Sequence, residues 1–423
     1  MQELSNYTKS NLNLYHEKKD CCGCGVCENV CPKDAIEMKL DSFGAYYPSI
    51  NLEKCIGCNI CINSCAYRKG DEMGDPLHAY AAVNKKENQL ALSSSGGVFS
   101  AIASYFLENG NCVCGAMMDL DNRRDIIHHC IITKPQNLKL LQGSKYGQSR
   151  LFDLYDACRK IFESGKKILF SGTPCQVNAF KHIFKKYESQ LFTLDLICHG
   201  VPGNKVFDDY INYIELNTGF KIVSFVFRDK NYGWGCNGQY STIKVNAGNV
   251  ERDMKLECKE ISSSSSSYYR YFLLGNIYRD CCYDCPFATS KRTGDLTIGD
   301  YWGIEKYNPE LLAENDGVFI RNKGISCVLA NTKKGLDLIQ HLESYCDFKE
   351  VDKNNVIEGN SQLRHPVALT KKRKKLKKKY EKNGYRGIEK EYEHDLRKNR
   401  LKNIISGMIP KHIKLFIKRR MNR

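Results

Sequence analysis

Hydrophobic residues follow two alternating spacings through the middle of this chain. Stretches in which apolar residues recur about every 3.6 positions, as on one face of an α-helix, are separated by short and nearly continuous apolar runs, as in buried strands. The predicted helices cover residues 97–109, 148–164, 174–187 and 204–216, and the predicted strands cover residues 112–118, 167–170 and 191–197. Strand and helix in turn, with glycine and proline in the connecting loops, predict a mixed α/β domain.

The segments outside this region have different patterns. Residues 221–260 predict several β-strands, and residues 295–342 predict a further stretch of strand and helix. The serine run 262–267 has low complexity and predicts a flexible loop. Near the start, residues 35–38 and 45–48 predict two short strands joined by a turn. We therefore expect a small β-hairpin in front of a larger α/β part.

The composition is that of an ordinary soluble protein. The chain has 423 residues, 42% of them hydrophobic, which predicts two or three domains. No run approaches the roughly 18 apolar residues that a membrane span requires. Residues 1–19 are polar and lack the apolar segment of a signal peptide. We therefore expect a cytoplasmic protein.

Cysteine is the component that departs most from an average composition. The chain contains 22 cysteines, nine of them between residues 21 and 65 and three between residues 281 and 285. In a reducing compartment, clustered cysteines more often bind metal or carry out redox chemistry than form disulfides. The cysteine clusters are therefore the first candidates for a functional site.

The first cluster of cysteines is an internal repeat of the spacing C-x2-C-x2-C-x3-C. Its copies contain Cys21, Cys24, Cys27 and Cys31, and then Cys55, Cys58, Cys61 and Cys65. In bacterial-type ferredoxins, the first three cysteines of such a run ligate one 4Fe–4S cluster and the fourth ligates the other. The predicted ligand sets are therefore Cys21, Cys24, Cys27 and Cys65 for one cluster, and Cys55, Cys58, Cys61 and Cys31 for the other. Zinc, the alternative, usually takes pairs of C-x2-C, and Cys22 is predicted to be a bystander.

A second group of cysteines is a candidate for a third cluster. Cys282 and Cys285 form a C-x2-C pair, and a cubane cluster needs four ligands. The best candidates for the other two are Cys175 and Cys198, because each follows a predicted strand, where α/β sheets place their active loops. The alternative is that these cysteines are unrelated, since free cysteine is often simply buried.

Seven short motifs in the body are similar to those of one family. They are SSGGVFS at residues 94–100, GSKY at 143–146, FSGTPCQ at 170–176, CHGVP at 198–202, FRDK at 227–230, CYDC at 282–285 and DLTIGDYWG at 295–303. Together with the cysteine repeat, they resemble the family of beta subunits of coenzyme F420-reducing hydrogenase and its dehydrogenase relatives over about residues 15–345. Members of this family are iron–sulfur flavoproteins, in which a flavin exchanges hydride and clusters connect it to one-electron partners. The resemblance therefore implies FAD and favours the third cluster.

The resemblance also directs attention to residues that would hold a flavin. Ser95, Gly96 and Gly97 open a predicted helix, whose first N–H groups and dipole favour a phosphate such as the pyrophosphate of FAD. An ordinary helix cap is the alternative. Lys145 and Tyr146 could contact the flavin or its phosphates, or lie in a surface loop.

Candidates for catalysis are fewer. Arg228 could bind an acidic substrate or cofactor, or be a surface charge at the end of a strand. His199, beside the candidate ligand Cys198, could donate a proton, although a lone histidine is more often structural. The candidates for a catalytic residue are therefore His199, Lys145 and Arg228, and the sequence does not choose among them.

The formal net charge of +16 is confined to the end of the chain. Residues 371–423 hold 21 Lys and Arg against 5 Asp and Glu, whereas the preceding residues hold 43 of each kind. The basic and partly amphipathic segment 404–420 predicts contact with an anionic membrane surface. A solvated tail and RNA binding are the alternatives. Because the body is neutral, we do not expect nucleic acid to be the partner.

These observations predict an α+β chain of three parts. Residues 1–75 are expected to form a bacterial-type ferredoxin domain with two 4Fe–4S clusters, residues 76–365 a mixed α/β domain with FAD and the third cluster, and residues 366–423 a basic helical tail. We expect an iron–sulfur flavoprotein oxidoreductase that acts on a small organic substrate or coenzyme, in the cytoplasm or peripherally at the inner membrane face. The alternative is a non-catalytic electron-transfer subunit that serves a redox partner protein.

Overall fold

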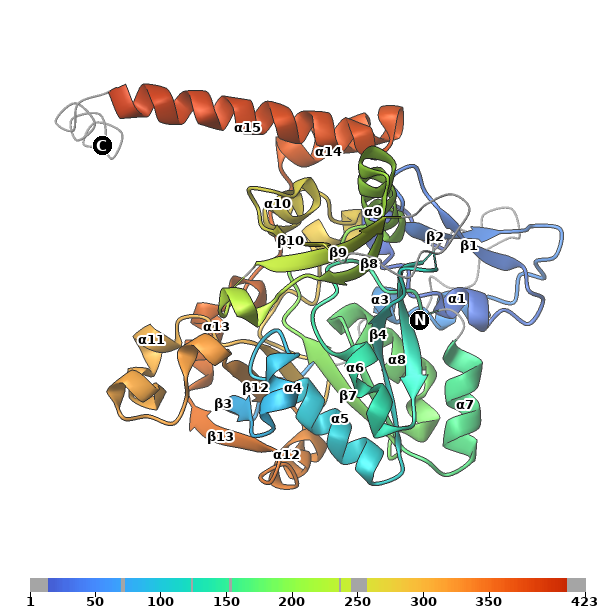
Figure 1. Ribbon diagram of the computed structural model, residues 1–423. Coiled ribbons are helices and arrows are strands. Elements are labelled where there is room, and N and C mark those ends of the chain that lie inside the picture. Colours follow the sequence, from blue (N-terminus) through green and yellow to red (C-terminus); the bar gives the residue numbers. More distant parts are fainter. Residues whose placement is uncertain are drawn as a thin grey trace, which may run out of the picture.

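The computed structural model describes residues 14–69, 73–122, 125–151, 154–235, 237–244 and 257–408. A large mixed sheet forms its centre, a small cysteine-rich domain lies on one side, and two C-terminal helices cross the top (Figure 1). The cysteine-rich domain lies against the main domain, so that the cysteines of both come close together.

The cysteine-rich domain contains the predicted hairpin and three short helices. Its elements are α1 (Val26–Asn29), β1 (Ile36–Leu40), β2 (Tyr46–Ile50), α2 (Ile60–Asn63) and α3 (Ala66–Lys69). The two strands are antiparallel, with Ile36 opposite Ile50. α1 and α2 each follow a residue with left-handed backbone, Gly25 at φ 79° and Asn59 at φ 58°. The two copies of the repeat therefore have the same local fold, a tight loop that ends in one helical turn.

The main sheet has eight strands in the order β13-β3-β12-β11-β7-β6-β4-β5. They are β3 (His78–Asn84), β4 (Cys112–Met118), β5 (Ile127–Ile132), β6 (Ile168–Gly172), β7 (Leu191–Leu196), β11 (Leu296–Asp300), β12 (Ser326–Ala330) and β13 (Cys346–Val351). The central strands β4, β6, β7 and β11 run parallel, and the flanking strands pair antiparallel. This mixed sheet agrees with the predicted α/β domain, although the sequence patterns did not reveal β3, β5 or β13.

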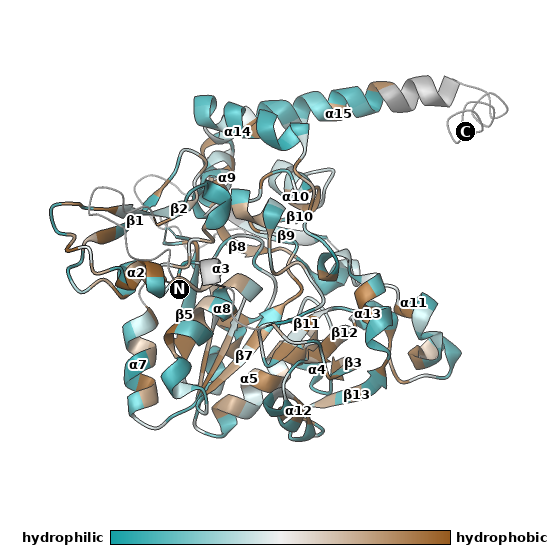
Figure 2. Cartoon of the chain, turned by 180° about the vertical axis from the view of Figure 1, so that it is seen from behind, coloured by the Kyte–Doolittle hydropathy of each residue, from teal (hydrophilic) through white to brown (hydrophobic). Residues whose placement is uncertain are grey.

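Helices cover both faces of this sheet (Figures 1 and 2). The α-helices between residues 87 and 359 are α4 (Glu87–Ala91), α5 (Val98–Glu108), α6 (Leu138–Leu141), α7 (Tyr155–Glu163), α8 (Pro174–Ile183), α9 (Asn204–Thr218), α10 (Ser267–Leu273), α11 (Ile304–Tyr307), α12 (Lys333–Gln340) and α13 (Lys353–Gly359), of which α9 and α10 pack on a second, smaller sheet. On one face, Ile102 of α5 and Leu338 of α12 pack in a core with Leu169 of β6. On the other face, Phe180 of α8 stacks on Phe170, the next residue of β6. Side chains alternate along a strand, so consecutive residues of β6 fill the two cores.

A second, three-stranded sheet confirms the strands predicted over residues 221–260. It consists of β8 (Phe220–Val226), β9 (Gly238–Lys244) and β10 (Glu257–Ile261), antiparallel in the order β10-β9-β8. With α9 and α10 it encloses an aromatic core that includes Phe207, Phe227 and Tyr268. The serine run beside it forms an exposed turn at residues 263–265, and its last two residues cap and begin α10. Ser266 caps α10, because its Oγ accepts a hydrogen bond from the N–H of Tyr269 at 3.1 Å.

One predicted helix begins later than its apolar spacing suggested. α7 starts at Tyr155, whereas the prediction started at residue 148. Gln148 Nε2 donates to the Cys22 carbonyl at 2.9 Å, and Gln176 Nε2 donates to the Ser149 carbonyl at 3.0 Å. Hydrogen bonds to distant loops therefore hold this segment in a conformation that local periodicity does not predict.

Residues 371–408 of the predicted basic tail form a helical hairpin packed on the body. It consists of α14 (Lys371–Asn383) and α15 (Tyr385–Met408), and most of the residues that Figure 2 colours in these two helices are hydrophilic. Leu376 is fully buried, and the guanidinium of Arg373 lies 4.1 Å from the centre of the Phe43 ring in the cysteine-rich domain. These helices therefore join both domains, which corrects the solvated-tail alternative for this part of the chain.

Most of the segment for which membrane contact was predicted lies outside the described residues. The hairpin itself ends at Met408. None of the helices that the structure describes is both long and apolar enough to cross a membrane.

Candidate functional site

The cysteines of the first predicted ligand set surround the start of α1. Gly23 has a left-handed φ of 67°, which lets the loop turn sharply between Cys21 and Cys24. Burial, followed by the neighbouring thiols of Cys24, Cys21 and Cys65, raises the pKa of Cys27 well above its usual range. Cys65 comes from the other copy of the repeat. The structure therefore brings together the four residues that the spacing assigned to one cluster, and their ligand role stays a prediction.

The second predicted set lines a small apolar cavity. Its thiols are those of Cys31, Cys55, Cys58 and Cys61, and Pro32, Ala35, Ile36, Ile50 and Ile56 form most of the remaining wall. Burial, followed by the thiols of Cys31 and Cys58, raises the pKa of Cys61 to about 11. Cys58 is exposed, and its neighbours Ile56 and Ile60 are 59% and 41% exposed. A thiol-lined apolar cavity suits an iron–sulfur cluster, and this one reaches the protein surface.

The third predicted set lies at the carboxyl ends of β6 and β7. Cys175 is in the first turn of α8, and Cys198 follows β7. Burial, followed by the thiol of Cys175, raises the pKa of Cys198 to about 12. Burial and the thiols of Cys175 and Cys198 likewise raise the pKa of Cys285, and Cys198 is also an electrostatic neighbour of Cys282. Four cysteines from three distant parts of the sequence are therefore electrostatic neighbours here, and their ligand role stays a prediction.

Cys22 lies between the first and third sets. Its thiol hydrogen-bonds with Cys175 and Cys24, which raises its own pKa and lowers the pKa of each of these two partners. Cys22 is buried, with 5% of its surface exposed. The spacing of the repeat predicted that Cys22 is a bystander, because only the fold shows that Cys175 comes next to it.

A cavity of about 510 Å³ opens beside the third set, within the range of about 300–1,000 Å³ that is usual for cofactor sites. Its wall includes the predicted residues Ser95, Gly97, Lys145, Tyr146, His199 and Arg228, together with Cys198. Gly96 is not in the wall. A Cβ atom there would lie 2.3 Å from the Ala82 carbonyl oxygen and 2.6 Å from the Ser326 nitrogen, so this glycine lets the loop pack against β3 and β12.

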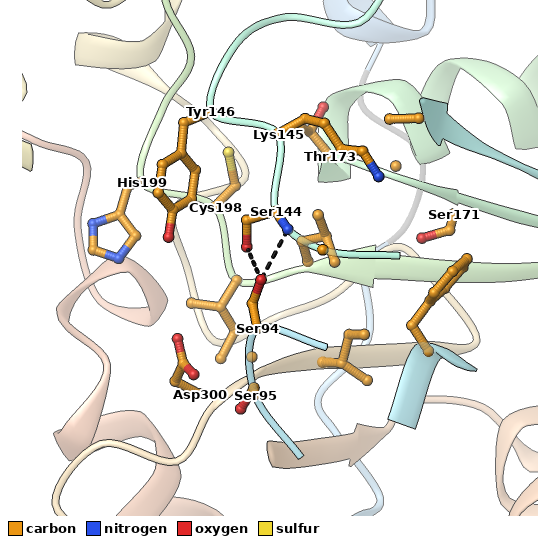
Figure 3. A pocket seen from close by; sticks show the side chains of 18 of the residues that line it. Ser94, Ser95, Ser144, Lys145, Tyr146, Ser171, Thr173, Cys198, His199 and Asp300 are labelled. Atoms are coloured by element: carbon orange, nitrogen blue, oxygen red, sulfur yellow. Dashed lines mark hydrogen bonds between the residues drawn. The ribbon is translucent and has the colours of Figure 1, made fainter. Parts of the chain in front are cut away.

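The serine loop before α5 is held in place by its own hydroxyl groups. Ser95 Oγ donates to the Ile325 carbonyl at 3.0 Å. Ser94 Oγ accepts from the N–H and the Oγ of Ser144 at 2.8 and 2.9 Å, which joins this loop to the segment of Lys145 (Figure 3). The first N–H groups of α5 have no partner within the helix and are available to a phosphate.

Lys145 places an amine in the wall of the cavity. Its Nζ donates to the carbonyl oxygens of Gln142 at 2.7 Å and Leu140 at 3.3 Å. Burial lowers its pKa to about 7. Near neutral pH this group can therefore hold or release a proton inside the cavity.

His129, on β5, is a wall residue that no sequence pattern predicted. Its Nε2–H donates to the Ser171 carbonyl at 2.9 Å, and its ring stacks on Phe170. Nδ1 is buried and has no partner among the described residues. Burial lowers the pKa of the ring to about 4, so it is neutral at physiological pH. The His128–His129 pair was the available signal, but the sequence does not show which of the two faces a cavity.

Arg228 and His199 lie at another part of the wall, beside two tryptophans. Arg228 donates from Nη1 and Nη2 to Asp300 at 2.5 and 3.1 Å. Trp234 donates from Nε1 to Asp300 at 2.8 Å and stacks on Trp302 with a centroid distance of 5.0 Å. The charge of Arg228 is thus balanced within the protein. His199 is exposed, and Gln362 is bonded to its ring.

Two comparisons of sequence relate this chain to known proteins. Residues 165–354 match the family described as coenzyme F420 hydrogenase/dehydrogenase, C terminus of the beta subunit, and residues 20–69 match the 4Fe-4S dicluster domain. The F subunit of the F(420)H(2) dehydrogenase of Methanosarcina mazei is 24% identical over 188 residues, which are 42% of this chain and 53% of that protein. This chain therefore spans about half the length of the curated relative that it matches.

A solved structure gives a third comparison. A chain of the xenon-derivatised F420-reducing [NiFe] hydrogenase complex from Methanosarcina barkeri is 12% identical, with a TM-score of 0.43, over 73% of this chain and 93% of that chain.

Proposed function

The chain belongs to the family of coenzyme F420 hydrogenase/dehydrogenase beta subunits, which are oxidoreductases, and has an N-terminal 4Fe–4S dicluster domain; from this premise, we propose that it is an iron–sulfur flavoprotein oxidoreductase. In this proposal the cavity holds FAD, and the three cysteine sets each hold a 4Fe–4S cluster. One observation carries the proposal, namely that Cys198 belongs both to the third cysteine set and to the wall of the cavity. A bound flavin would supply two-electron chemistry on a small organic molecule, and the clusters would supply one-electron transfer.

The residues of the cavity are suited to a flavin in three respects. The start of α5 offers N–H groups to a phosphate. His129 offers a buried acceptor without a protein partner in the described part of the chain, which a donor group of the bound ring would satisfy. Lys145 offers an amine that binds an anionic group while protonated and can exchange a proton at its Nζ atom.

The order of the cysteine sets in space supports electron transfer between the cavity and the surface. The third set begins at the cavity with Cys198 and continues to Cys175, whose thiol is hydrogen-bonded to that of Cys22. The Cys22 thiol is also hydrogen-bonded to that of Cys24 in the first set. The second set ends at the exposed Cys58. We propose that a one-electron partner protein docks at this end, where Ile56 and Ile60 offer exposed apolar surface.

Metal and flavin analysis tests this proposal against the non-catalytic alternative. The protein should be purified without oxygen, and its iron, acid-labile sulfide and extractable flavin should be measured per chain. About twelve irons and about one FAD are expected for three clusters and a flavin. About eight irons without flavin would favour the electron-transfer subunit. Turnover assays would then begin with coenzyme F420, the molecule after which the Methanosarcina mazei relative is named.

A pair of cysteine variants tests the third set by itself. Cys198→Ser should lower the iron content by about four per chain, because a cubane loses stability without its fourth ligand. Cys258→Ser is the matched control, since Cys258 lies exposed on β10. Equal iron content in Cys198→Ser and the control would contradict a cluster at Cys198.

A further inference from the structure

Arg279 reaches from the main domain into the loop that carries Cys21. Its side chain is buried, with 1% of its surface exposed. Nη2 donates to the Tyr46 carbonyl at 2.9 Å and to the Cys21 carbonyl at 3.4 Å, and the guanidinium lies 4.9 Å from the centre of the Tyr47 ring. A Cβ atom on Gly23 would come within 2.7 Å of both Nη atoms. A residue from outside the cysteine-rich domain therefore contacts the surroundings of the first cysteine set.

The charge of Arg279 has no carboxylate partner among the described residues. The other buried arginines of the described ranges each have one: Arg228 pairs with Asp300, Arg292 with Asp195, and Arg373 with Asp280. The hydrogen bonds of Arg279 to oxygen atoms go to neutral groups, including Oε1 of Gln148, and its Nε has no partner in the described part of the chain. The thiol of Cys281 also lies beside Arg279, and a hydrogen bond from Cys282 together with the charge of Arg279 lowers the pKa of this thiol to about 7. Burying a cation without an anion is unfavourable, so this arrangement favours negative charge beside Arg279, on the Cys281 thiol and on a group bound at the first cysteine set.

A cluster on the first cysteine set would be such a group. Four thiolates give a 4Fe–4S cluster a net negative charge, which grows by one on reduction. The predicted ligand Cys21 is in direct contact with Arg279 through its carbonyl. The wall of the second set contains one basic residue, Lys33, and that residue is exposed. A buried cation therefore distinguishes the two sets of the dicluster domain.

We propose that Arg279 raises the reduction potential of the cluster held by the first cysteine set, relative to the cluster held by the second. A buried positive charge stabilises the reduced cluster more than the oxidised one, because the reduced cluster carries one more negative charge. The charge of Arg279 thereby favours the first-set cluster as the site of the transferred electron. Because Arg279 belongs to the main domain, the reduction potential of this cluster depends on how the two domains pack. The inference rests on the clusters of the proposed function but does not require the flavin.

Redox titration of the anaerobically purified full chain, followed by electron paramagnetic resonance, tests this inference. Arg279→Gln should make the cluster of the first set at least tenfold harder to reduce at a fixed potential, which corresponds to 59 mV for one electron, and should leave the cluster of the second set unchanged. The same titration of Cys58→Ser, which removes a predicted ligand of the second set, assigns the signal. Arg279→Lys keeps the charge but loses the forked geometry, so its potentials should stay close to those of the unaltered protein.

The Arg279→Lys variant distinguishes an effect of the positive charge of Arg279 from an effect of its hydrogen bonds on the local structure. If Arg279 had only a structural role, the lysine variant would behave like the glutamine variant, and both would lose iron. Normal iron with an unchanged potential in Arg279→Gln would overturn the inference. If Arg279→Gln does not hold iron, its potentials cannot be measured, and the test then depends on Arg279→Lys. A lysine variant with its full iron content and a shifted potential of the first-set cluster would also overturn the inference. An unaltered protein with fewer than about eight irons would contradict the proposed clusters themselves.

Discussion

His129 donates from Nε2 to the carbonyl oxygen of Ser171 at 2.9 Å, and this hydrogen bond determines which ring nitrogen remains for a ligand. With the proton on Nε2, Nδ1 is an acceptor, and it is buried without a partner among the described residues. Because an unpaired buried acceptor is costly, a ligand of the cavity should donate a hydrogen bond to it.

The first prediction concerns this acceptor. His129→Phe should weaken the binding of FAD to flavin-free protein about tenfold, which is the loss of one hydrogen bond of about 1.4 kcal/mol. Fluorescence titration of the flavin measures the affinity. A flavin methylated at N3, which has lost its imide N–H, should bind the unaltered protein more weakly but His129→Phe equally well. If N3-methylation has the same effect on both proteins, His129 does not contact the imide.

The second prediction concerns the pH dependence of Lys145. Its folded-state pKa, lowered by burial to about 7, lies below the usual lysine value of 10.5. Between these values the unfolded chain binds more protons than the folded chain, so the stability that depends on this group rises with pH. Relative to Lys145→Met, the flavin-free protein should therefore become more stable as the pH rises from 7 to 10.

Thermal unfolding at a series of pH values checks this prediction. Lys139→Met is the control, because Lys139 is exposed on the neighbouring helix α6. A melting-temperature difference between Lys145→Met and the unaltered protein that does not change over this pH range would show that Lys145 is ordinarily solvated.

The third prediction concerns Asp300, which holds Arg228 and Trp234 together. Asp300→Asn should destabilise the protein by about 3 kcal/mol, because the guanidinium of Arg228 stays buried without its counter-charge. Trp234 and Trp302 are the two tryptophans of the chain, so intrinsic fluorescence reports on this wall. Their emission should shift to the red in the variant as water reaches the stacked rings.

Denaturant unfolding followed by tryptophan emission measures both effects. Glu305→Gln removes the partner of an exposed arginine, Arg321, and should cost less than about 1 kcal/mol. Similar losses of unfolding free energy in Asp300→Asn and Glu305→Gln would mean that water screens the pair of Arg228 and Asp300.

The fourth prediction concerns Glu391 of the C-terminal hairpin. Its carboxylate is 1% exposed and is paired with three lysines of α14, namely Lys372 at 2.9 Å and Lys375 and Lys379 at 2.7 Å. Although burial raises the pKa of Glu391, the lysines hold it at about 2. Glu391→Gln should therefore destabilise the hairpin by about 2 kcal/mol, less than for a fully buried pair because the lysines reach solvent.

Hydrogen exchange of α14 and α15 measures this loss. The stabilisation of the hairpin by the Glu391 carboxylate should be complete above pH 4.5, the pKa of this group in the unfolded chain. It should disappear as the pH falls toward about 2, the pKa of Glu391 in the folded protein. Glu393→Gln, on the same helix but paired only with the exposed Arg397 among the described residues, is the control. Equal exchange in the two variants at neutral pH would rule out a stabilising role of the lysine cluster.

Several elements of this protein follow from local patterns. The period of the apolar residues predicted α5 and α9 to within two residues at each end and α8 at its first residue, although α8 ends four residues earlier than predicted, because these helices bury one continuous face. It failed for residues 148–151, because buried side chains such as Gln148 bond to loops that are distant in sequence. It also missed β3 and β13, which carry polar residues and pair with strands far along the chain.

The candidate sites likewise contain residues that local spacing predicts and residues that only the fold brings together. The sequence by itself determined the spacing of the two cysteine repeats, and the two ligand sets are predicted from it, because cluster geometry requires a fixed spacing within one short segment. Only the tertiary structure decided that Cys22 meets Cys175, that His129 faces the cavity, and that Arg279 reaches the loop of Cys21. Each of these contacts joins segments more than 40 residues apart, and the distance between such segments depends on how strands pair and domains pack, which spacing does not encode.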